Sequence, residues 1–414
     1  MQSLLDGLNR EQQQAVQHTE GPLLILAGAG SGKTKVLTVR IAYLLAQGVN
    51  PYEILAITFT NKAAKEMKSR VEGLVGDVAN RIWLSTFHSF CAKFLRFELD
   101  NFLGYNSNFT IYDTSDSQVV IKAALKALNL DDKYYPVGAM ISAISDAKNK
   151  LMFASDYRKQ ARDFYQQKVA DVYEYYEREL RKNNALDFDD LLLVAVKLLQ
   201  SNAAVLDKYS KRFKYVMIDE YQDTNHAQYL LAYLLSSHWK NIAVVGDADQ
   251  SIYAWRGADI QNILDFEKDF PDAKVIKLEQ NYRSTQTIVC AANSLIEKNE
   301  RQIRKAVFSE KEKGEPIGVF QAYSDVEEGD IVANKIAELR REYRYGYADF
   351  AILYRTNAQS RIFEEALRKR SIPYKIYGGL SFYQRKEIKD VIAYFRLVVN
   401  PNDEEAFKRI INYP

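Results

Sequence analysis

The feature that most constrains this chain is a glycine-rich turn, AGAGSGKT at residues 27–34. The apolar run LLILA (23–27) precedes it and is typical of a strand buried on both faces, whereas VLTVRIAYLLAQG (36–48) follows as a helical stretch. In such a turn the backbone N–H groups point toward a phosphate at the helix N-terminus. The sequence therefore predicts an α/β domain that binds a phosphorylated ligand.

Residue types within the turn indicate individual roles. We expect Lys33 to reach the outer phosphates and Thr34 to bind Mg²⁺. The usual pattern begins with glycine, but the first position here is alanine. A glycine-rich connection with a chance Lys-Thr pair is the alternative interpretation. The expected phosphate-binding residues are Ala27, Gly28, Ala29, Gly30, Ser31, Gly32, Lys33 and Thr34.

A second apolar run, YVMIDEYQDTN from residue 215, ends in two acidic residues. At the end of a neighbouring strand, Asp219 suits Mg²⁺, and Glu220 is placed to accept a proton from an attacking water. Paired acids at a strand end also serve as helix N-caps, which is the alternative. A helical insertion between the two strings accounts for their wide separation in the sequence.

A third run, IAVVGDADQSIYAWRGA from residue 242, ends near Gln250, which is able to hydrogen-bond a γ-phosphate or an attacking water. Tyr253, Trp255 and Arg256 follow within six residues. Aromatic rings near such a sheet favour a stacking platform for unpaired bases. An aromatic core cluster is the alternative interpretation.

Short apolar runs alternate with helical stretches along the chain, which predicts parallel sheets with helices on both faces. The pattern changes between residues 114 and 184 to long, charged, tyrosine-rich helical segments, opened by SDSQ (115–118) with the spacing of a capping box. A second alternation begins with KVIKL (274–278) and continues through IGVFQA (317–322), FAILY (350–354) and YKIYG (374–378). We therefore expect a second α/β domain from residue 274.

Charge and composition limit the remaining classes. The formal net charge is +2, so a site for a polyanion must be local. Two cysteines are too few for a disulfide framework and fit a reducing cytoplasm. The start, MQSLLDGLNREQQQ, lacks the pattern of a signal peptide, and no apolar run is long enough to span a bilayer.

Ten ordered strings show that the sequence is similar to bacterial superfamily 1 DNA helicases of the UvrD/Rep/PcrA type over essentially its whole length. A P-loop alone indicates only a nucleotide binder, whereas the ten together are specific. The strings are LNREQQQAV, AGAGSGKT, ITFTNKAAKEM, STFHSF, ALDFDDLL, IDEYQDTN, VVGDADQSIYAWRGA, LEQNYRST, ILYRTNAQSR and FYQRKEIKDV.

The resemblance implies an α/β fold in which a RecA-like P-loop NTPase domain carries a helical insertion and precedes an incomplete second RecA-like domain. Strings of the family's later motifs are not found in this sequence, so we expect a truncated chain. The implied boundaries are 1–113 and 185–273 for the first RecA-like domain, 114–184 for the insertion, 274–380 for the second domain, and 381–414 for the start of an insertion in it.

The resemblance also implies an ATP-dependent 3′–5′ single-stranded DNA translocase and helicase of DNA repair or replication, in the cytoplasm with the nucleoid. ATP and Mg²⁺ are the implied cofactors. Single-stranded DNA, a duplex with a single-stranded tail and DNA-repair proteins are the implied partners, with no membrane. This chain is expected to bind ATP and DNA, to hydrolyse slowly and to be impaired in unwinding.

Family positions outside the P-loop add further candidates. Gln12 is expected to read the adenine edge, Tyr282 to stack on the base, and Arg283 to reach the γ-phosphate from the second domain as an arginine finger. Lys35 stands where the family commonly has an arginine, which predicts a modest loss of base affinity. The implied catalytic set is Lys33, Asp219, Glu220, Gln250 and Arg283.

Nine positions match the family's DNA-contacting motifs: Phe59, Asn61, His88, Phe188, Tyr253, Trp255, Arg256, Arg355 and Asn357. Phe59 and Phe188 could instead belong to the core. Two other functions remain open, the motor half of a helicase-nuclease and a non-motor module that binds single-stranded DNA or a partner. Replacing Glu220 with glutamine separates a motor, which loses activity, from a pure binder.

Overall fold

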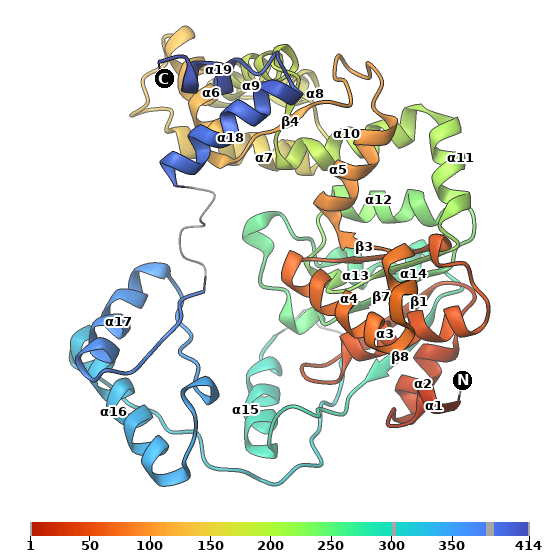
Figure 1. Cartoon of the computed structure of the whole chain (residues 1–414), viewed down its shortest axis with the longest axis vertical. Helices are drawn as coiled ribbons and strands as arrows, with labels where there is room; N and C mark the ends of the chain where they lie inside the picture. Colours follow the sequence, from red (N-terminus) through yellow and green to blue (C-terminus); the bar gives the residue numbers. More distant parts are fainter. Residues whose placement is uncertain (1, 300–303, 378–384, 413–414) are drawn as a thin grey trace. The chain divides into compact units, whose positions relative to one another are not determined.

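The computed structural model describes residues 2–299, 304–377 and 385–412 (Figure 1), without the side chains of Gln2 and Arg256. The chain divides into two compact units, which are described separately. The first comprises Met1–Glu315 and Arg396–Ala406, and the second comprises Pro316–Phe395 and Phe407–Pro414. The chain therefore passes from one unit to the other three times.

A six-stranded sheet forms the centre of the first unit, and all its neighbouring strands are parallel. The strand order is β3-β2-β6-β7-β1-β8. The strands are β1 (Leu23–Ala27), β2 (Ile54–Thr58), β3 (Trp83–Thr86), β6 (Tyr215–Ile218), β7 (Ile242–Gly246) and β8 (Lys274–Leu278). The expected parallel α/β architecture is confirmed, and the four apolar runs from residues 23, 54, 215 and 242 do share one sheet.

Both faces of this sheet are buried, which explains why its central strands are apolar throughout. In β1, Leu24 and Leu26 face one core, whereas Leu23 and Ile25 face the other, because successive side chains of a strand point to opposite faces. Helices α2, α3 and α4 cover one face, and α5, α10, α11 and α12 cover the other.

Outside the insertion, the first unit contains helices α1 (Gln2–Leu5), α2 (Arg10–Gln17), α3 (Lys33–Ala46), α4 (Asn61–Val75), α5 (Phe87–Glu98), α10 (Phe188–Ser201), α11 (Ala203–Arg212), α12 (His226–Ser236), α13 (Gln261–Leu264), α14 (Phe266–Asp269) and α15 (Gln286–Ile296). Short 3₁₀ turns are η1 (Pro51–Glu53), η2 (Gly76–Arg81), η3 (Tyr221–Asp223), η4 (Ala248–Gln250) and η5 (Ala254–Arg256).

A helical insertion with its own apolar core lies between β3 and β6 in the sequence. It contains α6 (Thr114–Ala127), α7 (Val137–Asn149), α8 (Ala154–Gln160) and α9 (Phe164–Lys182). Where it joins the sheet domain, β4 (Thr110–Ile111) pairs in parallel with β5 (Ala185–Leu186). The segment expected to be helical is therefore helical in the structure.

The capping box of α6 differs from the expected one. Asp113, not Ser115, is the N-cap: its carboxylate accepts from the backbone N–H groups of Ser115 and Asp116, and the Asp116 carboxylate accepts from Asp113 N–H. An aspartate two residues upstream thus competes successfully for the cap, because its side chain satisfies two N–H groups of the first turn.

The KVIKL strand also differs from expectation. We expected it to open the second domain, but β8 is the edge strand of the first sheet and pairs with β1 from Leu23 to Ala27. Which sheet a strand joins depends on backbone pairing with a distant segment, and a local apolar pattern does not specify the partner. The chain then continues in the first unit through α15.

Helices α16 (Asp325–Tyr343) and α17 (Ser360–Lys369) form a small core in the second unit. The unit also contains parts of α18 (Lys386–Val399) and α19 (Glu404–Ile410), with 3₁₀ turns η6 (Tyr347–Asp349) and η7 (Asn357–Gln359). Phe350 and Ile352 pack against this core, and the exposed Phe320 lines a pocket beside α16. Only the last residues of α18 and the first of α19 belong to the first unit.

No strand follows β8 within the described ranges, so the strands expected at 317–322 and 350–354 are not formed. Described residues 374–377 of YKIYG are likewise not a strand, and Gly378 lies outside the described residues. Apolar segments become strands only where a neighbour accepts their backbone hydrogen bonds, and residues 317–321 are exposed instead. The small core of the second unit consequently comes mainly from α16 and α17.

Two simple expectations concern cysteines and membranes. Cys91 is buried in the sheet core, whereas Cys290 on α15 is exposed. In the part of the chain that the structure describes, none of the helices has both the length and the apolar character needed to cross a bilayer.

Candidate active site and nucleic-acid groove

The glycine-rich turn lies between β1 and α3, as expected. Gly30 and Gly32 have left-handed backbones, with φ of 68° and 85°. A Cβ atom at Gly30 would lie 2.8 Å from both Arg283 Cβ and Asn281 Nδ2. The first position, Ala27, is the last residue of the buried strand, so its methyl group packs in the core and does not enter the turn. The turn is therefore narrow and glycine-dependent where a phosphate is expected.

Two expected base-contacting residues have protein partners. Gln12 is buried, its Oε1 accepts from Asn9 N–H at 3.1 Å, and its Nε2 donates to the Ser31 carbonyl at 2.9 Å. Lys35 Nζ donates to the Gly7 carbonyl at 2.8 Å. Gln12 thus supports the phosphate-binding turn in this structure, and its contact with adenine stays a prediction.

The acidic pair lies directly opposite the start of α3. Lys33 Nζ is 3.0 Å from Glu220 Oε2, and Thr34 Oγ1 donates to Asp219 Oδ2 at 3.4 Å. Glu220 has a left-handed backbone (φ 51°), a conformation that costs on the order of 1–3 kcal/mol for most residues. Neither acid caps a helix through its side chain: Asp219 Oδ1 accepts from Glu220 N–H, and Glu220 makes no cap bond to η3. The N-cap alternative is therefore wrong.

Burial, together with the negative charge of Glu220, raises the pKa of Asp219 to about 6. Asp219 and Thr34 supply the oxygen ligands that Mg²⁺ prefers. No group of three or more His, Cys, Asp or Glu side chains that could hold a metal ion occurs among the described residues. Protein-bound Mg²⁺ is usually held by one or two carboxylates together with phosphate oxygens and water, and the chemistry of Asp219 and Thr34 fits that pattern.

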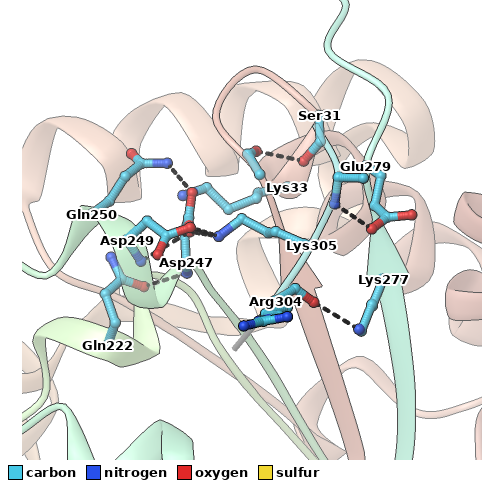
Figure 2. A network of polar contacts seen from close by, with 12 residues as sticks. Ser31, Lys33, Gln222, Asp247, Asp249, Gln250, Lys277, Glu279, Arg304 and Lys305 are labelled. Atoms are coloured by element: carbon cyan, nitrogen blue, oxygen red, sulfur yellow. Dashed lines mark hydrogen bonds and ion pairs between the residues drawn. The ribbon is translucent and has the colours of Figure 1, made fainter. Parts of the chain in front are cut away.

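Gln250 belongs to a continuous polar network that reaches Lys33, of which Figure 2 shows the part from Gln222 through Asp247 to Gln250. Glu220 Oε2 accepts from Lys33 and also from Gln222 Nε2 at 2.9 Å. Gln222 Oε1 accepts from Asp247 N–H at 2.9 Å, and Asp247 Oδ2 accepts from Gln250 Nε2 at 2.6 Å. The ends of β1, β6 and β7 are thus connected through side chains.

Lys305 completes this network and was not among the residues expected from the sequence. Its Nζ lies 2.5 Å from Asp247 Oδ1 and also contacts Asp249 Oδ2. Figure 2 shows the Lys305 side chain extending toward the two aspartates. No motif surrounds Lys305 in the sequence, so only the fold brings it to the site.

Tyr282 and Arg283 lie beside the phosphate-binding turn. Tyr282 N–H donates to the Gly30 carbonyl at 3.0 Å, and Asn281 Nδ2 donates to the Ala29 carbonyl at 2.6 Å. Arg283 is exposed and belongs to the same compact unit as the turn, whereas we expected it to reach the site from the second domain. The cause is that β8, which precedes it, pairs with β1.

Six of the nine expected DNA-contacting residues lie close together in the first unit. Phe59, Asn61, His88 and Phe188 line a pocket with about 690 Å³ of open space. The ring of Tyr253 is 5.3 Å from that of Phe59 and 6.3 Å from that of Trp255. These residues follow β2, β3, β5 and β7.

Exposure decides between core and surface for these rings. Phe188 is 50% exposed and Trp255 is 68% exposed, so the core alternative is wrong for Phe188. Phe59 is half-buried and lines the pocket. Burial lowers the pKa of His88, whose ring meets that of Phe188 edge-on at 5.8 Å. The surface therefore offers apolar and aromatic faces together with few charges.

The remaining three candidates are not part of this cluster. The side chain of Arg256 lies outside what the structure describes. Arg355 and Asn357 are exposed in the second unit, before and at the start of η7. Their contact with nucleic acid stays a prediction.

A buried ion-pair cluster holds Phe188 in place. Asp187 is the N-cap of α10, which begins with Phe188. Lys148 at the end of α7 is 1% exposed and lies 2.7 Å from Asp187 Oδ2 and 2.8 Å from Asp190 Oδ1. The next residue, Asn149, accepts a 2.6 Å hydrogen bond from Asn225 Nδ2, at the N-cap of α12. The insertion is thereby bonded to the aromatic groove, formed by Phe59, Asn61, His88, Phe188, Tyr253 and Trp255. It is also bonded to the segment that follows the acidic pair Asp219–Glu220.

Comparisons with known proteins find two helicase domains in this chain. Residues 8–271 match the UvrD/REP helicase N-terminal domain, and residues 276–414 match the UvrD-like helicase C-terminal domain. The chain is 52% identical over 415 aligned positions to the ATP-dependent DNA helicases PcrA of Staphylococcus aureus and Staphylococcus epidermidis.

Each of these alignments covers all of this chain and 57% of the relative, so the chain spans a little over half the length of the curated relatives it matches. The match to the N-terminal domain covers more than half of the chain and includes the glycine-rich turn, the acidic pair and Gln250. The resemblance inferred from the ten strings is thereby confirmed, and the chain belongs to the UvrD/REP family of helicases.

Proposed function

We propose that this chain is the nucleotide-hydrolysing and strand-gripping part of an ATP-dependent, single-stranded DNA translocase and helicase. One observation carries the proposal: the phosphate-binding turn, the acidic pair, Gln250 and the aromatic groove all follow the carboxyl ends of strands in one parallel sheet, or of the adjoining β5. Ligands of such sheets bind at these ends. A nucleotide and a nucleic-acid strand can therefore be held by one rigid element.

Each side chain has a role in this proposal. Lys33 neutralises the outer phosphates, Glu220 accepts the proton of the attacking water, and Gln250 orients that water or the γ-phosphate. Thr34 and Asp219 hold Mg²⁺, which supplies charge neutralisation at the phosphates. Arg283 stabilises the charge that develops on the transferred phosphoryl group.

The contacts suggest how binding and hydrolysis are connected. Lys33 pairs with Glu220, and a phosphate that attracts Lys33 would compete with this ion pair and free the carboxylate for its role as base. The same carboxylate is bonded to Gln222, which contacts Asp247 next to the groove segment carrying Tyr253. Movement at the phosphates is thereby transmitted to residues that stack on bases.

Finer parts of the proposal follow from the family resemblance. These are 3′–5′ polarity, duplexes with a single-stranded tail as substrates, repair proteins as partners, and a cytoplasmic, nucleoid-associated location. We further propose that the 414-residue chain binds both ligands, hydrolyses ATP slowly and unwinds poorly. Unwinding of 3′-tailed and 5′-tailed duplexes by this chain, measured side by side, tests both polarity and impairment.

Phosphate release from ATP, with and without single-stranded DNA, tests the central proposal. We expect DNA-stimulated release, and Glu220→Gln is expected to reduce it by about 10²–10⁴-fold, the usual contribution of a general base. Nucleotide binding, followed with a fluorescent ATP analogue, should persist in Glu220→Gln. Release that Glu220→Gln leaves unchanged, or no release together with DNA binding, would favour the non-motor binding module.

A further inference from the structure

Lys305 is a buried cation at the site, and the proposed chemistry gives it no role. Its side chain is 7% exposed, and its partners Asp247 and Asp249 are 3% and 9% exposed. Two carboxylates buried side by side are unfavourable unless a cation compensates them. Lys305 supplies that positive charge from a segment of the chain more than 50 residues further on.

Several bonds hold the segment that carries Lys305 along β8. Lys277 Nζ donates to the Arg304 carbonyl at 2.8 Å, Ala306 N–H donates to Glu279 Oε1 at 2.7 Å, and Phe308 N–H donates to the Glu279 carbonyl at 3.0 Å. Figure 2 shows Lys277, Glu279 and Arg304, with the bond between Lys277 and Arg304. The Lys305 ammonium group therefore starts from a fixed backbone.

The same segment touches the phosphate-binding turn. A Cβ atom built on Gly28 would lie 2.6 Å from Val307 Cγ2, so Val307 packs directly on the first glycine of the turn. Val307 thus contacts the turn, and Lys305, two positions before it, contacts Asp247 and Asp249. A shift of the turn on nucleotide binding has a short path to Gln250.

Asp247 is the group through which Lys305 acts on Gln250. Its Oδ1 contacts Lys305 and accepts from Asp249 N–H at 3.1 Å, and its Oδ2 accepts from Gln250 Nε2 at 2.6 Å. One amide hydrogen of Gln250 is thereby fixed, which sets the orientation of the rest of the carboxamide. If Asp247 turned toward another donor, Gln250 would lose that restraint.

We propose that Lys305 is a positioning residue for Gln250, holding Asp247 and Asp249 so that the Gln250 carboxamide keeps one orientation at the phosphate site. This inference rests on the proposed function, since it assigns Gln250 to water or γ-phosphate. Lys305 itself touches neither reactant. Its loss should therefore slow the chemical step and leave ATP affinity nearly unchanged.

Steady-state ATP hydrolysis with single-stranded DNA tests this split. We expect Lys305→Ala to lower kcat by about 10-fold or more, the scale seen when a group behind a functional side chain is removed, with KM for ATP within about twofold. Lys305→Arg should retain most of kcat. The exposed Lys298, replaced by alanine, is the matched control and should behave as wild type.

A double-substitution cycle separates positioning from general damage. In a Gln250→Ala background, Lys305→Ala should cause little further loss of kcat, because residues that act as a unit are non-additive. If the fold-loss of kcat in the double variant equals the product of the two single losses, the proposal is overturned. A raised KM with unchanged kcat in Lys305→Ala would also overturn it. A lowered melting temperature with unchanged kcat would also overturn it, by showing a purely structural role.

A nucleotide-free measurement distinguishes failure of this inference from failure of the proposed function. Hydrogen exchange of residues 247–252 should speed up in Lys305→Ala and stay unchanged in Lys298→Ala, since Gln250 N–H is bonded to the Asp247 carbonyl at 2.9 Å. Unchanged exchange in Lys305→Ala overturns the inference. A wild-type chain that releases no phosphate overturns the proposed function, and the exchange result still stands.

Discussion

At the scale of single residues, Glu220 is both charged and in a strained backbone conformation. Glu220 keeps a left-handed backbone although it has a side chain, and it is held on both sides by Lys33 and Gln222. Such conformations persist where the surroundings over-determine them. The strain aims the carboxylate at the phosphate-binding turn instead of along the strand. This conformation cannot be read from the string IDEYQDTN, which only places two acids after an apolar run.

Residue types in local strings were the most predictable part of the site. Lys33, Thr34, Asp219, Glu220 and Gln250 all lie in one network because each follows a recognisable strand. Gln222, Asp247 and Lys305 were missed as participants. The first two lie inside quoted strings, but their partners are set by side-chain geometry, and Lys305 lies in no string at all.

Phe188 should contribute directly to the binding of single-stranded DNA. Stacking of one base on its exposed ring is worth about 1–3 kcal/mol, so Phe188→Ala should weaken binding about 5- to 150-fold. Fluorescence anisotropy of a labelled oligonucleotide measures this. Phe164→Ala, which removes a comparably exposed phenylalanine from α9, is the control. Equal affinity of the two variants would show that Phe188 does not stack.

His88 should make stability depend on pH. Burial lowers its pKa below 6.5, so the unfolded chain binds a proton at a higher pH than the folded chain does. The stability associated with neutral His88 is therefore fully present above pH 6.5 and is lost as the pH falls through the folded-state pKa. Urea unfolding between pH 5 and about 8 measures the slope. His88→Gln should flatten it, whereas replacement of the exposed His238 should not.

At the scale of elements, the structure depends on how the insertion is joined to the sheet domain. The joint consists of the β4–β5 pair and the ion pairs of Lys148. In both, the residues that contact each other are far apart in the sequence. Lys148 also lies 4.9 Å from the centre of the Tyr176 ring, whose hydroxyl donates to Asp187 at 2.9 Å. The first turn of α10 is thus fixed by α7 and α9 together.

Removing the Lys148 charge should destabilise the first unit strongly. Lys148→Met leaves Asp187 and Asp190 buried without their cation, and breaking a buried pair in this way costs about 3–5 kcal/mol. Urea unfolding monitored by circular dichroism measures the loss. Lys150→Met, two residues further along on an exposed position, should change the unfolding free energy little. Similar stability of the two variants would contradict the assigned role of the cluster.

Elements were predictable where their signal is local. The strand–turn–helix at residues 23–46 and the helical stretch from residue 114 formed as expected, because apolar periodicity and glycine placement act over a few residues. Which strands pair with each other was not predictable. β8 pairs with β1 of the first sheet, and the described apolar runs of the second unit form no strands. The α6 cap moved by two residues, because an upstream aspartate bonds two backbone N–H groups.

At the scale of the whole molecule, residues far apart in sequence complete the first unit. Asn400 is fully buried, and its Nδ2 lies 3.0 Å from Thr110 Oγ1, 2.8 Å from the Asn183 carbonyl and 3.1 Å from the Asn184 carbonyl. Tyr112 donates to Asp403 Oδ1 at 3.0 Å, and Arg396 pairs with Asp116 at 2.9 Å. The segment 396–406 is therefore a structural part of the insertion joint.

Loss of the Asn400 carboxamide should lower the stability of the first unit. Asn400→Ala removes the side-chain donor to the buried Asn183 carbonyl, and an unsatisfied buried group costs about 1–3 kcal/mol, whereas the Asn184 carbonyl keeps the Thr110 N–H. Thermal unfolding followed by circular dichroism measures the shift. The exposed Asn402, replaced by alanine, is the control, and equal melting temperatures would show that segment 396–406 does not support the unit.

The threefold passage of the chain between its units affects how the protein responds to a protease. A cut between residues 316 and 395 leaves two fragments, and each of them contributes residues to both units. The carboxyl-terminal fragment still carries Asn400 and Asp403, which are anchored in the first unit. The nicked protein should therefore migrate as one species under native conditions and separate only in denaturant.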